Sequence, residues 1–269
     1  MKYDPIKKDF GTVVRTWPVL RALFYKILGV MFLREWHVKR ELRKQLSNRQ
    51  TPPTIFDAGS GFGQYSYYCA KKFPGCTIHA VDVKEEQIRD CKEFFSRAGL
   101  SNVTFAVEDL LVPKHENEFD FIMSVDVMEH IEDDVQVFKN FFRALKPGGK
   151  LLINTPSNLG GSDAHDEHDA SFIEEHARNG YSVEEISQKL TSVGFTMETA
   201  RYTYGPAGSL AWRLGIKYPI LMLGASKIFI IVLPFYYLLT FWLTLILMYI
   251  DYSTTNTAGT GLSVVAVRK

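Results

Sequence analysis

Cysteine, net charge and repetition are the features this sequence has least of. Its 269 residues include three cysteines, Cys69, Cys76 and Cys91, with no Cys-x-x-Cys pair among them, which argues against a zinc ribbon or a disulfide scaffold. The net charge is only +1, and no internal repeat or low-complexity segment is visible. With 46% hydrophobic and 23% charged residues, the composition is typical of a folded globular protein and excludes a disordered one.

The small net charge conceals two regions of opposite sign. Residues 1–50 contain 12 Lys and Arg against 4 Asp and Glu, a charge of +8, whereas the remainder contains 19 against 26, a charge of −7. From Phe10 to Leu46, aromatic and aliphatic residues mix with Arg and Lys, a pattern typical of a basic helical region at an anionic membrane surface. Arg21 and Lys26 interrupt any apolar stretch, so we expect no signal peptide here. Nucleic-acid binding is the alternative explanation for the charge, but we expect no nucleic-acid partner.

Strand-like and helix-like segments alternate from residue 50 to residue 205. Short apolar segments predict strands, and longer segments with apolar residues three and four apart predict helices. The expected strands are 54–59, 76–83, 103–109, 119–127, 150–157 and 196–205, and the expected helices are 64–73, 84–100, 133–149 and 182–195. Such alternation predicts a doubly wound, mostly parallel α/β sheet with helices on both faces.

A glycine-rich loop follows the first predicted strand. Gly59, Gly61 and Gly63 allow the backbone to turn tightly and approach a ligand, and the next helix offers its free N–H groups at the same place. Asp82 ends the second strand, where it is placed to accept hydrogen bonds from a ribose diol. Gln64 stands where the dinucleotide-binding fingerprint has its third small residue. The loop therefore differs from that of the dinucleotide enzymes.

Five segments occur in a fixed order: IFDAGSGFG, AVDV, VED, FDFIMSVDVMEHI and LKPGGKLLINTPS. Together they resemble the motifs of class I S-adenosylmethionine-dependent methyltransferases, over about residues 50–205 plus the last strand. The resemblance implies a Rossmann-like seven-stranded sheet with an antiparallel last strand, and an in-line methyl transfer for which a general base is optional. It implies S-adenosyl-L-methionine as the cofactor. The positions carried over are Asp57, Gly59, Gly61 and Gly63 for the methionine part, Asp82 and Val83 for the ribose, Glu108, Asp109 and Leu110 for the adenine, and Asp126 and Val127 beneath the sulfonium.

Histidines mark the segment between the fifth strand and the next helix. Such a connection commonly covers the active site in this fold, and histidine suits proton removal near neutral pH. The candidate bases are His130, His165, His168 and His176. A charged lid without chemistry is an alternative, with Gly160 and Gly161 as its hinge, and the His-x-x-His spacing also allows a metal. We expect no metal site.

Residues 228–250 form a run of 23 residues without a charge. As a helix this run would reach about 34 Å, enough to cross a bilayer core of about 30 Å. A single crossing would separate strand 196–205 from its expected neighbour, strand 261–269, so the insert must leave and return on one side. We expect residues 208–225 and 228–250 to form a monotopic membrane hairpin, with Trp212, Arg213 and Lys217 at headgroup level. Packing against the protein's own core or a dimer partner is the alternative.

The sequence thus predicts three regions. Residues 1–50 form a basic amphipathic region, 51–205 and 259–269 a methyltransferase domain, and 206–258 a hydrophobic membrane-associating insert. We expect O- or C-methylation of a lipophilic acceptor (a quinone-, phenol-, isoprenoid- or lipid-like molecule) at the cytoplasmic face of a membrane. The alternatives are methylation of a soluble small molecule or RNA, and a non-catalytic cofactor-binding membrane adaptor. No oligomeric state is predicted.

Overall fold

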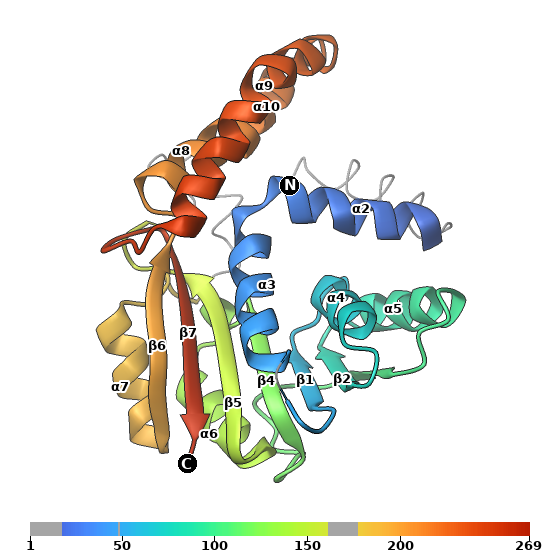
Figure 1. Cartoon of the computed structure of the whole chain (residues 1–269), viewed down its shortest axis with the longest axis vertical. Coiled ribbons are helices and arrows are strands. Elements are labelled where there is room, and N and C mark those ends of the chain that lie inside the picture. Colours follow the sequence, from blue (N-terminus) through green and yellow to red (C-terminus); the bar gives the residue numbers. More distant parts are fainter. Residues whose placement is uncertain (1–17, 48, 161–176) are drawn as a thin grey trace.

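One seven-stranded sheet organises the molecule, a computed structural model that describes residues 18–47, 49–160 and 177–269. The strand order is β3-β2-β1-β4-β5-β7-β6 (Figure 1). The strands are β1 (Thr54–Ala58), β2 (Thr77–Asp82), β3 (Val103–Val107), β4 (Phe119–Val125), β5 (Leu145–Pro156), β6 (Phe195–Thr203) and β7 (Gly261–Arg268). Strands from β3 to β5 pair in parallel, whereas β7 is antiparallel to both β5 and β6. The predicted doubly wound sheet with an antiparallel last strand is confirmed.

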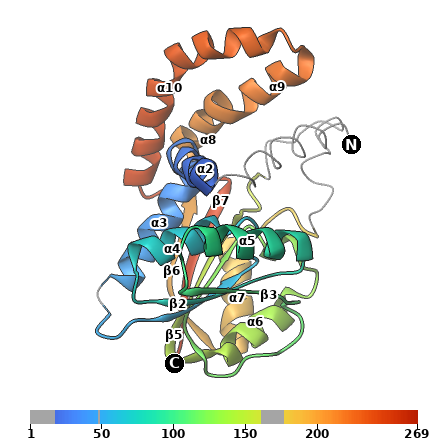
Figure 2. The same cartoon turned by 90° about the vertical axis from the view of Figure 1, so that its right-hand side faces the viewer.

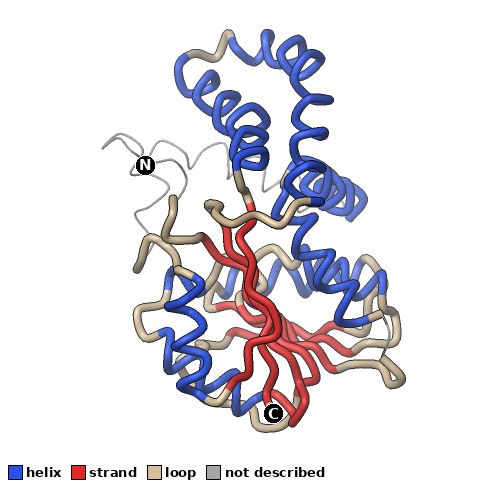
Figure 3. The backbone as a smooth tube through the Cα atoms, turned by 60° about the vertical axis from the view of Figure 1, so that its left-hand side comes forward, coloured by secondary structure: helices blue, strands red, loops and turns tan. Residues whose placement is uncertain are grey.

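Helices cover both faces of this sheet (Figure 3). They are α3 (Leu33–Leu46), α4 (Gln64–Lys72) and α5 (Glu85–Arg97) on one face, and α6 (Asp134–Ala144) and α7 (Val183–Val193) on the other. The first face buries a cluster that includes Leu42 and Phe95, and the second a cluster that includes Phe138 and Leu190. Each helix places its apolar stripe on the sheet, as the sequence spacing predicts.

Helix α6 ends five residues before its predicted end at residue 149. Its start is capped by Asp133, whose carboxylate accepts a hydrogen bond from Gln136 N at 3.1 Å. Strand β5 begins directly after the helix, at Leu145, and therefore contains Pro147. Its pairing with β4 is irregular at this point, because the register shifts between Phe119 and Phe121. The proline and glycines therefore interrupt a strand here instead of ending a helix.

The carboxyl ends of most strands lie along one edge of the sheet. Strands β5 and β6 both run antiparallel to β7, so β6 points the same way as β5 and the other parallel strands. The helices that follow β6 therefore rise from the edge at which β1, β2, β3 and β4 end (Figure 1). In an open α/β sheet, this is the edge at which ligands bind.

A helical hairpin projects from this edge, away from the sheet (Figures 1 and 2). It consists of α8 (Pro206–Trp212), a π-helical turn (Arg213–Lys217), α9 (Tyr218–Ala225) and α10 (Phe229–Ser253). The hydroxyls of Tyr236 and Tyr237 donate to Leu214 O at 2.7 Å and Gly215 O at 2.8 Å, so the two arms are tied near the π-helical turn. The predicted hydrophobic helical insert before the last strand is confirmed.

Helix α10 leaves most of its apolar surface uncovered. Its 25 residues have a mean hydropathy of 2.2 over the most apolar window, of which only 6% is buried. Leu239 is 80% exposed and Leu238 is 72% exposed. By length and composition it is the one helix of the described ranges that could cross a membrane. A core helix of a soluble protein would be mostly buried, so the protein's own core does not cover this insert.

A buried polar cluster fixes the base of the hairpin to α3. Asp251, near the end of α10, accepts hydrogen bonds from His37 Nε2 at 3.0 Å, Gly205 N at 2.7 Å and Asn256 Nδ2 at 3.0 Å. Arg40 donates to Tyr252 O at 2.6 Å beside this cluster. Burial lowers the pKa of His37, so the ring is neutral at physiological pH and acts as a hydrogen-bond donor.

The basic N-terminal region differs in part from its prediction. In α2 (Pro18–Met31), Arg21 is buried and donates to Phe62 O at 2.8 Å, so its charge binds the domain instead of lipid. Arg34 pairs with Asp126, and Arg40 is held as described above. The opposite face of α2 is apolar and exposed, through Val19, Leu20, Leu23, Ile27 and Val30. Within the described part of this region, Arg21, Arg34 and Arg40 thus act as internal contacts, while these apolar residues of α2 face outward.

Candidate cofactor and acceptor site

The glycine loop between β1 and α4 has the conformation that its sequence predicts. Gly59, Gly61 and Gly63 all have positive φ, at +82°, +50° and +73°, a region that other residues adopt only with strain. A Cβ at Gly59 would lie 2.3 Å from a methyl carbon of Val127. The loop can therefore contact the end of β4 only because residue 59 has no side chain.

A cavity of about 490 Å³ lies beyond this loop, within the range of small-molecule sites. Most of the predicted cofactor residues line it: Gly59, Gly61, Asp82, Val83, Glu108, Asp109, Leu110, Asp126, Val127 and the candidate base His130. Asp82 Oδ2 accepts from Gly61 N at 3.0 Å, so the second strand and the loop are held together. Residues that the sequence analysis missed include Arg34, Ser60, Phe62 and Tyr65.

Asp57 and Gly63 do not line the cavity. Asp57 lies buried behind the loop and accepts a hydrogen bond from Ser66 Oγ at 2.6 Å, which ties β1 to α4. Burial raises the pKa of Asp57 to about 7, with the charge of Asp82 adding to the shift despite the hydrogen bond from Ser66. A Cβ on Gly63 would lie 3.1 Å from Phe95, so this glycine allows α4 to pack on α5. Both residues therefore support the conformation of the loop without lining the cavity.

The end of β4 carries backbone strain at the cavity wall. Asp126 has a φ of +53°, which is uncommon for a residue with a side chain. Its carboxylate pairs with Arg34 from α3, and its N–H donates to Asn154 O at 2.8 Å. The side chain that the resemblance places beneath the sulfonium is thus held in one orientation.

A second cavity, of about 220 Å³, adjoins the first, and Arg34 and Asp126 line both. Its walls come from the ends of β5 and β6 and from the base of the hairpin, with Phe32 and Trp212 as its large apolar side chains. Its polar groups include Asn154, Thr155, Tyr204 and Ser209. Asn154 is 4% exposed, and its Nδ2 has no hydrogen-bond partner within the described ranges. A buried donor of this kind suits an oxygen of a bound molecule.

Two candidate proton acceptors, His130 and Glu129, lie next to these cavities. His130 lines the larger cavity and is partly exposed. Its neighbour Glu129 is buried, and its Oε2 accepts from Thr155 Oγ1 at 3.0 Å. Burial raises the pKa of Glu129. The candidates His165, His168 and His176 lie outside the described residues.

The cavity residues fit the cofactor that the motifs imply. Asp82 is positioned to accept from a diol, and the apolar residues Val83 and Leu110 flank the space expected for a purine. Ser60 Oγ is buried without a partner in the described part of the chain, and the loop beside it leaves room for a ligand only because Gly59 lacks a side chain. A small polar ligand would satisfy this hydroxyl.

Comparisons with known proteins agree with this reading. The family model described as a methyltransferase domain matches residues 53–201. Phosphoethanolamine N-methyltransferase 2 of Caenorhabditis elegans is 28% identical over 172 residues, which cover 63% of this chain and 39% of that protein. Phosphoethanolamine N-methyltransferase 1 of Arabidopsis thaliana is 34% identical over 155 residues, which cover 53% and 28%. The chain thus matches well under half of the length of these curated relatives.

The solved structures show the same fold. The structure of Haemonchus contortus phosphoethanolamine N-methyltransferase 2 with S-adenosyl-L-methionine superposes with a TM-score of 0.61 at 22% identity. The match covers 87% of this chain and 52% of that one. At this identity the likeness concerns the fold.

Proposed function

Because the chain belongs to the family of S-adenosylmethionine-dependent methyltransferase domains, we propose that it methylates an amphiphilic acceptor with a lipophilic part at a membrane surface. The observation that carries this proposal is the position of the smaller cavity, which lies between the cofactor cavity and the base of the exposed apolar hairpin. An acceptor with an apolar tail could extend along the hairpin while its polar end occupies the cavity.

Different residues of the chain bind the cofactor and align the acceptor for methyl transfer. The bound cofactor supplies a methyl group activated by positive sulfur, so alignment and exclusion of water contribute much of the rate. The glycine loop and Asp82 hold the cofactor. Asp126, fixed by its ion pair with Arg34, forms the wall that the two cavities share. In the proposed reaction, these contacts would align an acceptor atom with the methyl group.

A proton route is available for O-methylation. Thr155 lines the acceptor cavity and donates its hydroxyl proton to Glu129 at 3.0 Å. An acceptor hydroxyl can pass its proton to Thr155 Oγ1 as Thr155 passes its own to the carboxylate. A buried carboxylate with a raised pKa suits this task near neutral pH.

Two apolar surfaces support the membrane part of the proposal. The hairpin and α2 lie at the same end of the molecule in both cartoon views (Figures 1 and 2). Each exposes a stripe of large apolar side chains, and surfaces of this kind mark membrane or partner sites. The exposed cations of α2 and α3, such as Lys26 and Lys44, favour an anionic cytoplasmic leaflet.

The relatives favour a second candidate function. The two curated relatives named above are phosphoethanolamine N-methyltransferases. N-methylation of a phosphorylated amine, either free or as a lipid headgroup, would place its anionic group near the Arg34 guanidinium and the Asn154 amide. The free and lipid-bound forms differ in whether the product partitions into organic solvent.

Labelled methyl transfer tests these functions directly. Full-length protein in detergent is incubated with methyl-labelled S-adenosylmethionine and either a total membrane-lipid extract or phosphoethanolamine. We expect label in the organic phase with wild type and with Glu93→Ala, an exposed carboxylate on α5. Asp82→Ala should lose the product because the cavity loses its diol acceptor.

The remaining outcomes separate the alternatives. Label only in the aqueous phosphoethanolamine reaction would support the soluble second candidate. Intact binding of S-adenosylhomocysteine without any product from lipid or phosphoethanolamine would contradict both of these functions and favour the adaptor.

A further inference from the structure

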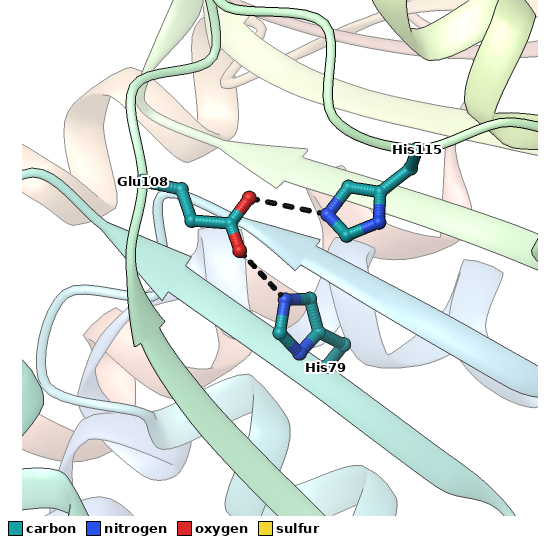
Figure 4. Close-up of side chains that lie close together, drawn as sticks. All are labelled: His79, Glu108 and His115. Carbon is teal, nitrogen blue, oxygen red and sulfur yellow. Dashed lines mark hydrogen bonds and ion pairs between the residues drawn. The ribbon is translucent and has the colours of Figure 1, made fainter.

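Three side chains that are distant in sequence converge beside the sheet (Figure 4). His79 lies in β2, Glu108 directly after β3, and His115 near the end of the connection from β3 to β4. His79 Nε2 is 3.1 Å from Glu108 Oε1, and His115 Nε2 is 3.1 Å from Glu108 Oε2. One ligand atom from each residue lies within 4.8 Å of the other two.

The outer nitrogen of each histidine is held by a second acceptor. His79 Nδ1 is 3.0 Å from Thr104 Oγ1, which donates its own proton to Ile78 O at 3.2 Å, so Nδ1 must carry the proton. His115 Nδ1 is 2.9 Å from the carboxylate of Glu118, which again requires a proton on Nδ1. In neutral imidazole the other nitrogen is then a lone-pair acceptor. Metal-binding histidines are oriented in this way by their outer nitrogen.

Three polar groups face one another at this point: the Nε2 atoms of His79 and His115 and the carboxylate of Glu108. With neutral rings, two Nε2 lone pairs lie against the carboxylate, and either a shared cation or a proton on each ring makes these contacts favourable. Lys114 Nζ is 3.9 Å from Glu108 Oε2, and its side chain is 45% exposed, so it can swing toward solvent. The cluster has the composition of a cation site.

Packing holds the rings in these positions. The His79 ring is stacked on Phe56 at 5.8 Å and on Phe119 at 6.2 Å, with interplanar angles of 17° and 11°. The His115 ring lies 5.1 Å from Phe119. Aromatic neighbours make the site rigid without offering competing ligands.

We propose that His79, Glu108 and His115 bind a divalent transition-metal ion of the zinc class. Two imidazoles and a carboxylate are a ligand set that zinc accepts, with a fourth position left for water. Tetrahedral ligands at zinc distances lie about 3.4 Å apart, close to the 3.1 Å between each histidine and Glu108. Small rotations of the two imidazole rings would bring all three ligand atoms to these distances.

The ion would fix the β3–β4 connection to strand β2. Residues 108–118 form no helix, although most crossovers in this sheet contain one. The three ligands join both ends of this connection to β2, and Asp109, Leu110 and Leu111 between them line the cofactor cavity. The sequence does not bring these three residues together, because they are separated by 29 and 7 positions.

Metal titration tests the proposal. Full-length protein in detergent is stripped with chelator, dialysed, and titrated with Zn²⁺ by calorimetry and with Co²⁺ by visible absorption at pH 7.5. We expect about one ion per chain, a tetrahedral Co²⁺ spectrum and a higher melting temperature with Zn²⁺, since a ligand that binds only the folded state stabilises it. His79→Gln and His115→Gln should each weaken Zn²⁺ binding about tenfold or more.

The double variant His165→Ala/His168→Ala is the matched control. It removes the other pair of histidines with metal-like spacing, and it should keep the ion and the Co²⁺ spectrum. Loss of the ion in this control with retention in His79→Gln would overturn the proposal. Absence of stoichiometric binding to wild type would also overturn it, independently of whether any variant folds.

Discussion

At the scale of single residues, Gly59 is the position at which the cofactor loop has least room. Gly59→Ala would place a Cβ 2.3 Å from Val127 at a φ of +82°, so we expect the loop to shift and the affinity for S-adenosylhomocysteine to fall about tenfold or more. Gly99→Ala is the matched control, because Gly99 also has a positive φ, of +67°, but nothing lies within 4 Å of its Cβ position. Titration calorimetry should show unchanged affinity for the control; equal losses in both variants would contradict the steric explanation.

Asp57 should give stability an unusual dependence on pH. Its folded-state pKa of about 7 exceeds the value of about 3.9 in an unfolded chain. Between these values the folded state keeps a proton that the unfolded state has lost, so stability falls as pH rises from 4 to 7 and then levels. The full effect is at most about 4 kcal/mol. Asp57→Asn should remove this slope from the free energy of unfolding, measured with urea at pH 5 to 8 in ligand-free protein.

Asp120→Asn is the control for the pH experiment. Hydrogen bonds from Thr54 and the ion pair with Lys146 lower the pKa of Asp120 and outweigh the effect of its partial burial. Asp120 is therefore ionised in both states throughout pH 5 to 8, and its substitution should leave the slope of wild type. If Asp57→Asn also runs parallel to wild type, the Asp57 pKa is not raised.

At the scale of elements, the junction of α3 and α10 depends on one carboxylate. Asp251→Ala would leave His37 and Gly205 N buried without their acceptor. Each lost bond to a charged group costs about 1.5–3 kcal/mol, so we expect the free energy of unfolding to fall by about 3 kcal/mol or more. Glu93→Ala, which breaks an exposed i,i+4 pair with Arg97, should change it by about 0.5 kcal/mol or less. A similar small effect at Asp251 would mean that the hairpin base is held by apolar packing.

At the scale of the whole molecule, the exposed hairpin should decide whether the protein binds membranes. Leu238→Glu/Leu239→Glu places two charges on the uncovered surface of α10 and should reduce flotation with phosphatidylcholine–phosphatidylglycerol vesicles about tenfold. Binding of S-adenosylhomocysteine should not change, because the cavity lies beyond the base of the hairpin. Val112→Glu, at a residue that is 52% exposed on the β3–β4 connection, is the control. Undiminished flotation of the double variant would contradict the hairpin anchor.

Local patterns and distant contacts differ in how well the sequence predicts them. Gly59 and Asp82 could be predicted because each lies where a recognisable strand ends, and strand ends in a parallel sheet share one edge, whereas Asp126 came from the family resemblance. Arg34 was missed as a cavity residue because α3 meets Asp126 only in the folded chain. The Glu129 carboxylate adjoins a residue that was chosen, but only its burial against Thr155 distinguishes it.

The place of β7 in the sheet has a consequence for synthesis. This strand lies between β5 and β6, yet the chain reaches it only after making the whole hairpin. Until then β5 is an open edge, and β6 has no neighbour through which to join the sheet. A growing chain folds from its N-terminal part onward. The apolar hairpin therefore leaves the ribosome while the domain is still incomplete. Its apolar surface must be removed from water, by a membrane or a chaperone, before the last strand completes the sheet.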